Sequence, residues 1–325
     1  MGTLPCVVED CHGVIQLYSD GFVNRLDDSL MNFNITLQDD GSVVWQDSVF
    51  DERHGLCLRL YKPVSATKTS KLPIVYYLHG GGFCLGSRTW PNCHNSCLRL
   101  SAALQAVVVA PDYRLAPEYR LPAAIDDSVT VLEWLRDQAK CKSLDEAFLD
   151  CADFDRVYVL GDSSGGNLAH HLAVQFGPGS VELSPVRVRG YVLLAPFFGG
   201  TKRTKSEAEG EPEPILNLES LDRSDRFWRL SLPAGKNADH PFANPFGPAS
   251  LDLERVELDP ILVIAGGKEL MKDRIKEYAM RLKGMGKNVD YVEFEGKQHG
   301  FFTEDPYSEV SDQLLQLITK FMHNN

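Results

Sequence analysis

The chain has 325 residues, of which 43% are hydrophobic and 24% are charged, a composition typical of a globular protein with a large core. Its 33 basic and 45 acidic residues give a formal net charge of −12, which argues against binding to nucleic acid or anionic membranes and favours small neutral or cationic ligands. No apolar run is close to the length of a membrane span, which is about 18 residues, and no signal peptide is evident. We therefore expect a cytoplasmic protein, with the nucleus as a second compartment.

The cysteine and histidine spacings predict neither disulfide bonds nor a metal site. The eight cysteines form no Cys-x-x-Cys pair, and the nine histidines form no cluster with metal-ligand spacing. A cytoplasmic chain is expected to keep its thiols reduced. No internal repeat or low-complexity tract is evident.

The N-terminal part of the chain has strand-like patterns. Residues 13–26 place Ser-Asp-Gly between two apolar stretches, as a β-hairpin does, and residues 42–50 and 56–63 are further strand-like stretches. We expect residues 1–45 to cover part of the surface as a cap element.

From residue 72 onward, apolar strands alternate with amphipathic helices. The strands are continuous apolar runs, expected to be buried on both faces, at residues 72–78, 106–113, 156–161, 190–196 and 260–267. Helices are indicated where apolar residues share one face, at Ile125, Val129, Leu132 and Leu135, at Ile275, Tyr278, Ala279, Leu282 and Met285, and at Leu314, Leu315, Ile318 and Phe321. The alternation predicts one α/β domain with a mostly parallel sheet and helices on both faces.

A glycine-rich motif, His-Gly-Gly-Gly at residues 79–82, directly follows the strand at 72–78. Glycines at the carboxyl end of a strand leave backbone N–H groups unobstructed, so these groups can converge on one point. Acyl transfer needs such donors, because the attacked carbonyl oxygen becomes an oxyanion. We predict an oxyanion hole made by the N–H groups of Gly81, Gly82 and Ser164, with a flexible loop as the alternative.

A second motif, Gly-Asp-Ser-Ser-Gly at residues 161–165, matches Gly-x-Ser-x-Gly and selects Ser163 as a nucleophile. A strand-like run precedes it and a helix-like run follows, so the serine would lie on a tight turn above the sheet edge. Glycines are needed there because the turn is strained and other backbone comes close. A glycine-rich turn without chemistry is the alternative, and the presence of both motifs argues against it.

An insertion at residues 199–248 interrupts the alternation. It begins polar and acidic and then becomes apolar and aromatic. An insertion after the carboxyl end of a strand can lie over the active-site face, so we interpret it as a cap, with a surface excursion and one ordinary helix as an equally weighted alternative. Six aromatic residues could line an apolar pocket, although aromatics more often belong to the core: Phe83, Trp90, Phe197, Phe198, Phe227 and Trp228.

A serine nucleophile needs a base, and a histidine oriented by a carboxylate is the usual solution. In serine hydrolases with a parallel sheet, the chain order nucleophile, acid, base selects His299, which follows a strand-like stretch. The acid should follow the strand at 260–267. Glu269 comes first and Asp273 follows one turn later, and we favour Glu269.

Together these residues resemble a known family, the hormone-sensitive-lipase-like α/β hydrolases, and within it the plant carboxylesterases. The resemblance runs from residue 56 to the C-terminal helix and rests on HGGGF, DYRLAPEYRLPAAIDD, GDSSGGN, GGKELMKD and HGFF, in family order. It implies the α/β-hydrolase fold, a Ser-His-acid triad, hydrolysis of a small-molecule ester or lactone, and no cofactor. Arg114 and Glu118 look like a structural ion pair. Family members usually have Ala in place of Ser164 and Asp in place of Glu269.

Two branches of this family have other functions. Gibberellin receptors bind a hormone under an N-terminal lid and lack the catalytic histidine, and a dehydratase branch has Thr in place of the nucleophile. Because Ser163 and His299 are both present, hydrolysis is favoured over a hormone-binding receptor and over a lyase. Residues 87–97, 186–200 and 227–235 are similar to the strigolactone-hydrolysing carboxylesterases, which implies a strigolactone as substrate.

Overall fold

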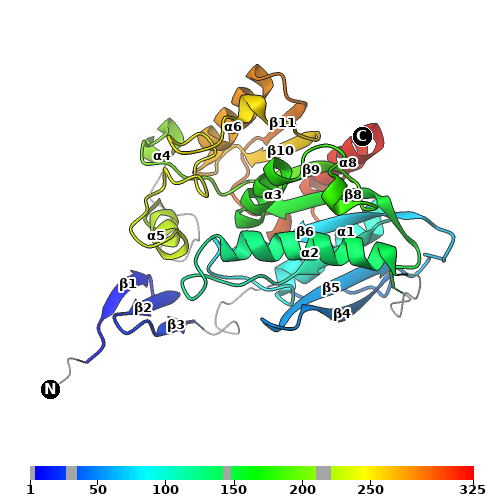
Figure 1. The fold of residues 1–325 in the computed structure, drawn as a ribbon, viewed down its shortest axis with the longest axis horizontal. Helices are drawn as coiled ribbons and strands as arrows, with labels where there is room; N and C mark the ends of the chain where they lie inside the picture. The colour runs from blue at the N-terminus through cyan, green and yellow to red at the C-terminus, as the bar shows by residue number, and fades with distance from the viewer. Residues whose placement is uncertain (1–3, 27–34, 142–147, 210–220) are drawn as a thin grey trace.

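The structure is a computed structural model that describes residues 4–26, 35–141, 148–209 and 221–325. Within these residues, eight strands form one sheet in the order β11-β10-β9-β8-β6-β7-β5-β4 (Figure 1). The pairs β4–β5 and β5–β7 are antiparallel, and the other pairs are parallel. The strands are β4 (Val43–Asp51), β5 (Leu56–Pro63), β6 (Leu72–Leu78), β7 (Val107–Pro111), β8 (Ala152–Asp162), β9 (Val188–Leu194), β10 (Ile261–Gly266) and β11 (Val289–Phe294).

Helices cover both faces of this sheet (Figure 1). Helices α2, α3 and α6 pack on one face, and α1 and α8 pack on the other. The longer helices are α1 (Pro91–Leu104), α2 (Ala123–Lys140), α3 (Ser164–Gln175), α5 (Leu221–Ser231), α6 (Lys272–Gly284) and α8 (Glu309–Asn324); the short ones are α4 (Lys205–Glu209), α7 (Phe301–Glu304) and the 3-10 turns η2 (Val181–Leu183) and η3 (Leu253–Arg255). The predicted mostly parallel sheet with helices on both faces is confirmed.

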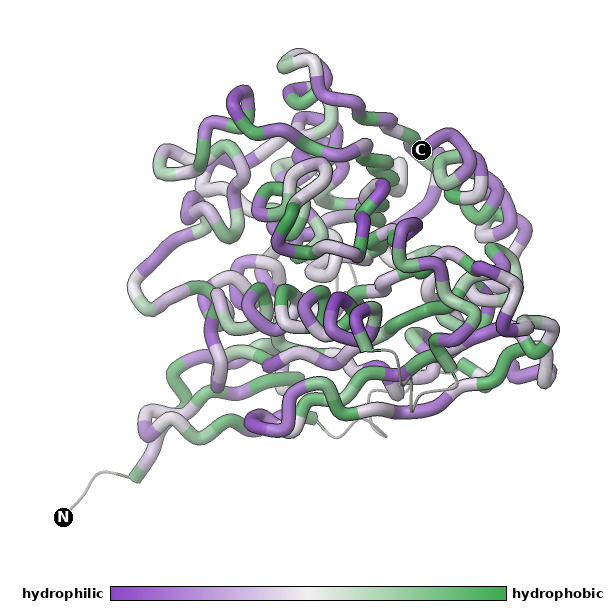
Figure 2. The backbone as a smooth tube through the Cα atoms, turned by 45° about the vertical axis from the view of Figure 1, so that its right-hand side comes forward, coloured by the Kyte–Doolittle hydropathy of each residue, from purple (hydrophilic) through white to green (hydrophobic). Residues whose placement is uncertain are grey.

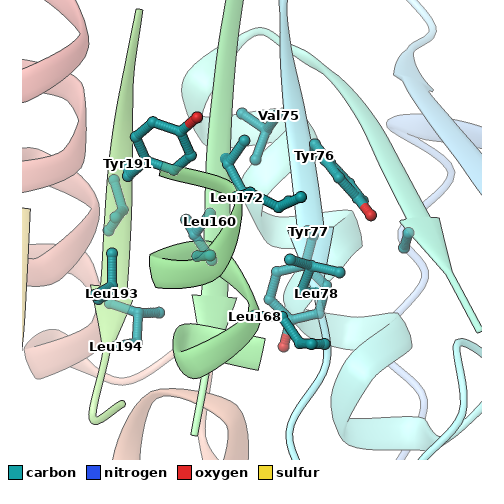
Figure 3. Packing of buried hydrophobic residues seen from close by; sticks show 14 of the residues in the cluster. Val75, Tyr76, Tyr77, Leu78, Leu160, Leu168, Leu172, Tyr191, Leu193 and Leu194 are labelled. Atoms are coloured by element: carbon teal, nitrogen blue, oxygen red, sulfur yellow. The ribbon is translucent and has the colours of Figure 1, made fainter. Parts of the chain in front are cut away.

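The core lies on both sides of the central strands. Figure 2 shows hydrophobic and hydrophilic residues alternating along the helices, as expected for helices with one face on the core. Residues 74–78 of β6 are all buried, and Leu168 and Leu172 of α3 pack against this part of the sheet (Figure 3). Burial on both faces explains why the strands are continuously apolar. The loops at the carboxyl edge of the sheet are therefore attached to strands that are packed on both faces.

A separate antiparallel sheet at the N-terminus lies beside α5 (Figure 1). Its strands in the described residues are β1 (Val7–Cys11), β2 (Ile15–Tyr18) and β3 (Val23–Arg25), and β2 and β3 form the hairpin predicted for residues 13–26. Glu9 of β1 accepts hydrogen bonds from Arg226 at 2.7 Å and Arg229 at 2.8 Å. These contacts join the N-terminal segment to the inserted segment.

The predicted ion pair between Arg114 and Glu118 is wrong. Arg114 pairs with the buried carboxylate of Asp127 in α2 at 2.7 Å. Glu118 pairs instead with Arg25 at the end of β3, and Arg25 also donates to the backbone carbonyl of Cys84 at 3.1 Å. The two residues therefore attach their loop to two separate parts of the fold.

Three further observations concern the chain as a whole. In the ranges that the structure describes, no helix combines the length and apolarity needed to cross a membrane. All eight cysteines lie in described residues and are free thiols. Of the two segments predicted as caps, residues 1–3, 27–34 and 210–220 lie outside the described residues.

Candidate active site

Ser163 lies on the turn between β8 and α3, at the carboxyl edge of the sheet. Its φ of 52° and ψ of −115° are a strained combination for a residue other than glycine. Glycine is required at residue 161 because other backbone lies close to it: a Cβ atom on Gly161 would lie 2.1 Å from the carbonyl oxygen of Gly165. A hydrogen bond of 2.8 Å from the Ser163 N–H to the carbonyl of Leu194 holds the turn on the sheet. The structure thus has the predicted strand–serine–helix turn.

The glycine loop follows β6 and lies against this turn. A Cβ atom on Gly80 would lie 3.1 Å from Cβ of Ser163. Gly81 and Gly82 have φ values of +122° and +60°, which favour glycine. In the described part of the chain, the N–H groups of Gly81, Gly82 and Ser164 donate no hydrogen bond to another residue. Ser164 is the first residue of α3, where free N–H groups carry partial positive charge. These three donors can therefore receive an oxygen atom.

His299 and Glu269 meet from two neighbouring loops, after β11 and after β10 respectively. Nδ1 of His299 lies 2.8 Å from Oε2 of Glu269. Glu269 is 1% exposed, and its Oε1 accepts a hydrogen bond of 2.6 Å from the backbone N–H of Gly266. A further bond of 2.8 Å from the N–H of Lys268 to the carbonyl of Lys297 joins the two loops. A carboxylate held in this way orients the imidazole and keeps the proton on Nδ1, which leaves Nε2 to act as a base.

Asp273, the alternative acid, lies in the first turn of α6. Its carboxylate accepts a hydrogen bond of 2.7 Å from the backbone N–H of Ser206 in α4. Its neighbours in the sequence have other partners: Arg274 pairs with Glu207, and Lys272 donates to the backbone carbonyl of Gly267. The structure therefore brings Glu269, rather than Asp273, to His299.

Asp162, the residue before Ser163, was given no role by the sequence reasoning. Its side chain is buried and accepts a hydrogen bond of 2.8 Å from the Tyr77 hydroxyl, and a Cβ atom on Gly80 would lie 2.6 Å from its Oδ2. Burial raises the pKa of Asp162 to about 6, while the Tyr77 hydrogen bond and the charge of His299 oppose that rise. His299 is thus within electrostatic range of the serine turn. The sequence signal was a carboxylate inside a motif otherwise made of glycine and serine.

Four of the six predicted pocket aromatics gather beside the glycine loop, and all four are buried. Trp228 stacks on Phe197 with 4.4 Å between ring centroids, and Phe83 lies 5.7 Å from Trp228. A Cβ atom on Gly82 would lie 2.5 Å from the ring of Phe227. Helix α5 of the insertion therefore covers the loop directly.

The other two predicted aromatics lie elsewhere. Phe198 packs against His170 and Tyr278, with 5.7 and 4.7 Å between ring centroids. Trp90 is buried at the start of α1. A role in substrate binding stays a prediction for all six.

Comparison with known proteins identifies the family of the chain. A profile of the family described as alpha/beta hydrolase fold matches residues 75–303. Probable carboxylesterase 6 of Arabidopsis thaliana is 39% identical over 243 residues, which are 74% of this chain and 69% of that protein. Gibberellin receptor GID1C of the same plant is 34% identical over 287 residues, 84% of this chain and 79% of that protein.

A solved structure is similar over nearly the whole chain. It is that of EstE1, described as a thermophilic and thermostable carboxylesterase cloned from a metagenomic library. The TM-score is 0.73 at 29% identity, and the match covers 91% of this chain and 93% of that one. The likeness therefore extends beyond the residues that the profile matches.

Proposed function

This chain belongs to the alpha/beta hydrolase fold family and is a carboxylesterase-type hydrolase, and from this premise we propose that Ser163, His299 and Glu269 form its catalytic triad. The substrates are small-molecule carboxylic esters or lactones. The hydrogen bond of 2.8 Å between His299 and the buried Glu269 carries the proposal, because it is the pairing that a base needs in order to activate a serine. The strained backbone of Ser163 supports it.

The reaction follows from the roles of these groups. Oγ of Ser163 attacks the carbonyl carbon while Nε2 of His299 removes its proton, and Glu269 stabilises the imidazolium through Nδ1. The N–H groups of Gly81, Gly82 and Ser164 stabilise the oxyanion. His299 then gives the proton to the leaving alcohol. Water attacks the acyl-enzyme by the same route and releases the acid.

Turnover of a chromogenic ester tests this mechanism. The parent protein should hydrolyse para-nitrophenyl acetate, and Ser163→Ala should lose all but a few per cent of that rate while keeping its melting temperature. The residual rate of such a variant reflects the oxyanion hole and binding alone. Unchanged hydrolysis by Ser163→Ala would contradict the proposal.

A hormone-binding protein is the second candidate, and the 34% identity to a gibberellin receptor favours it. The His299–Glu269 pair favours hydrolysis, since a receptor that does not turn over its ligand needs no base. The two functions differ in what happens to the bound ligand, which an esterase cleaves and a receptor releases intact. A ligand recovered intact from saturated protein, without ester turnover, would favour the receptor.

We further propose that a strigolactone is the substrate. Three segments resemble the strigolactone-hydrolysing carboxylesterases, and the aromatic cluster of Phe83, Phe197, Phe227 and Trp228 offers an apolar surface beside the glycine loop. Mass spectrometry should find a free tricyclic product and a released butenolide, with turnover well above that of long-chain lipid esters. Intact strigolactone after long incubation with protein that cleaves aryl esters would refute this substrate.

Residues 1–45 and 199–248 are proposed as two cap elements of a single domain. The contact of Phe227 with the glycine loop and the ion pairs of Glu9 with Arg226 and Arg229 support this arrangement. If the caps shape the entrance for substrate, Glu9→Gln should raise KM for bulky esters and leave kcat for para-nitrophenyl acetate unchanged. An unchanged KM for every ester would argue against a cap role for this contact.

A further inference from the structure

A pocket of about 420 Å³ lies where α4, α6 and the loop after β9 meet. Helices α4 and α6 are neighbours in the fold (Figure 1). Among the described residues, the lining includes none of the proposed catalytic residues and no residue of the glycine loop. The volume is large enough for a small metabolite. The pocket is therefore separate from the proposed catalytic site and has room for a ligand of its own.

Cationic side chains predominate in the lining of this pocket. Five cationic side chains and three carboxylates line it, although the whole chain has a formal net charge of −12. The cations come from the loop after β9, from α4 and from α6, and they are Lys202, Arg203, Lys205, Arg274 and Arg281. Clustered positive charge attracts anions and repels cations. The pocket thus has the charge expected of an anion site, in a chain whose overall charge disfavours anions.

The three carboxylates of the lining already have partners. Asp239 accepts a hydrogen bond of 3.1 Å from the backbone N–H of Thr201. Asp273 accepts one of 2.7 Å from the backbone N–H of Ser206. The third carboxylate, that of Glu277, pairs with an arginine one turn further along α6. Carboxylates with such partners repel an incoming anion less than free carboxylates do, because the donors carry partial or full positive charge.

Lys202 is the cation of the lining that remains available for a ligand. Its side chain is exposed, and it forms no ion pair with another described residue. The other four cations each pair with a carboxylate. In the same loop, the backbone N–H groups of Gly200, Lys202 and Arg203 donate no hydrogen bond within the described residues. The loop after β9 therefore offers an ammonium group and backbone donors to an anion.

Hydrogen bonds and packing hold the walls of the pocket in place. The side chain of Arg274 is 11% exposed, and its guanidinium donates to the backbone carbonyls of Gly200 and Lys202 at 3.1 and 2.7 Å. The guanidinium of Arg281 lies 3.7 Å from the ring centroid of Phe246. Groups that are already held in place lose little conformational entropy when a ligand binds. The arrangement therefore favours binding to the pocket as it stands.

We propose that this pocket binds a small anion with at least two negative charges, carried by carboxylate or phosphate groups. Lys202 supplies a charge without a competing carboxylate. Arg281 supplies a second charge, since its pair with Glu277 is 3.4 Å long and about half exposed. Two cations in one pocket are matched best by a ligand with two charges. The proposal goes beyond the esterase function and does not depend on it, because binding is measured without an ester.

Isothermal titration calorimetry with citrate and with pyrophosphate, at low ionic strength, tests the site. At least one of these probes should bind the parent protein at one site per chain, and Lys202→Gln should weaken that binding about tenfold. The matched control is Lys276→Gln. Lys276 is also exposed and lies on α6, but it does not line the pocket. This variant removes the same charge and should keep the dissociation constant within about twofold of the parent.

Three results would overturn the proposal. They are the failure of both probes to bind at millimolar concentrations, binding that Lys202→Gln leaves unchanged, and equal weakening by Lys202→Gln and Lys276→Gln. The last result would mean that the probes respond to the overall charge of the protein rather than to this pocket. Binding of pyrophosphate alone would identify phosphate groups as the preferred ligand, and binding of citrate alone would identify carboxylates. A parent protein without ester turnover would contradict the proposed function and leave this test unaffected.

Discussion

Glu269→Gln is the most informative change at the proposed triad. Glu269 uses both carboxylate oxygens, Oε1 for the N–H of Gly266 at 2.6 Å and Oε2 for Nδ1 of His299 at 2.8 Å. Glutamine keeps one oxygen and replaces the other with an NH₂ donor. If the remaining oxygen stays with Gly266, the amide faces Nδ1 and forces the imidazole to accept there. The imidazole proton then lies on Nε2, and a protonated Nε2 cannot take the proton of Ser163.

The expected magnitude follows from that loss of the base. Placing the imidazole in the wrong tautomer and removing its charge partner costs about 10³- to 10⁴-fold in kcat. This corresponds to about 4–5.5 kcal/mol in the activation free energy. The matched control is Asp273→Asn, since Asp273 bonds to the N–H of Ser206. It should stay within about tenfold of the parent, near 1.4 kcal/mol.

Initial rates of para-nitrophenyl acetate hydrolysis at saturating substrate measure both variants. Thermal unfolding followed by circular dichroism shows whether each is folded at the assay temperature. We expect Glu269→Gln to melt close to the parent, because the side chain keeps its shape and one hydrogen bond. A Glu269→Gln enzyme within tenfold of the parent, or a larger loss in Asp273→Asn, would refute the assignment of Glu269.

Three further changes test the rest of the site. Ser164→Ala should keep kcat within about threefold because its backbone N–H remains, and a collapse of turnover in steady-state assays would show that its hydroxyl takes part. Gly82→Ala should lower kcat by about 100-fold or more, because a Cβ atom would lie 2.5 Å from the Phe227 ring and φ is +60°; turnover at the parent rate would mean that the loop is not the oxyanion hole. Trp228→Ala should lower the free energy of unfolding in urea by about 3–5 kcal/mol, since it removes a buried ring stacked on Phe197, and a loss below about 1 kcal/mol would contradict that packing.

The fold could be predicted because its strands are buried on both faces. Residues 72–78 and 260–267 are continuous apolar runs. Strand β6 has the predicted bounds, and β10 is one residue shorter at each end than predicted. The serine turn could be predicted because Gly161 and Gly165 have no room for a side chain. The sequence favoured Glu269 over Asp273 because Glu269 comes first after the strand, and the structure has Glu269 in contact with His299.

Contacts between distant segments could not be predicted from spacing. Arg114 and Glu118 are four residues apart, but their segment is not helical, so the spacing does not place them side by side. Their partners, Asp127 and Arg25, depend on how α2 and the N-terminal sheet pack. The hydrogen bond between Tyr77 and Asp162 could not be predicted for the same reason, since the two residues lie on different strands.

The nucleophilic role of Ser163 is tested most directly by covalent trapping. Protein treated with a fluorophosphonate ester should gain the mass of one phosphonyl group, and peptide mapping should place that group on Ser163. The Ser163→Ala variant should gain none. An adduct on another residue, or continued ester hydrolysis by protein that gains no adduct, would contradict the proposed mechanism.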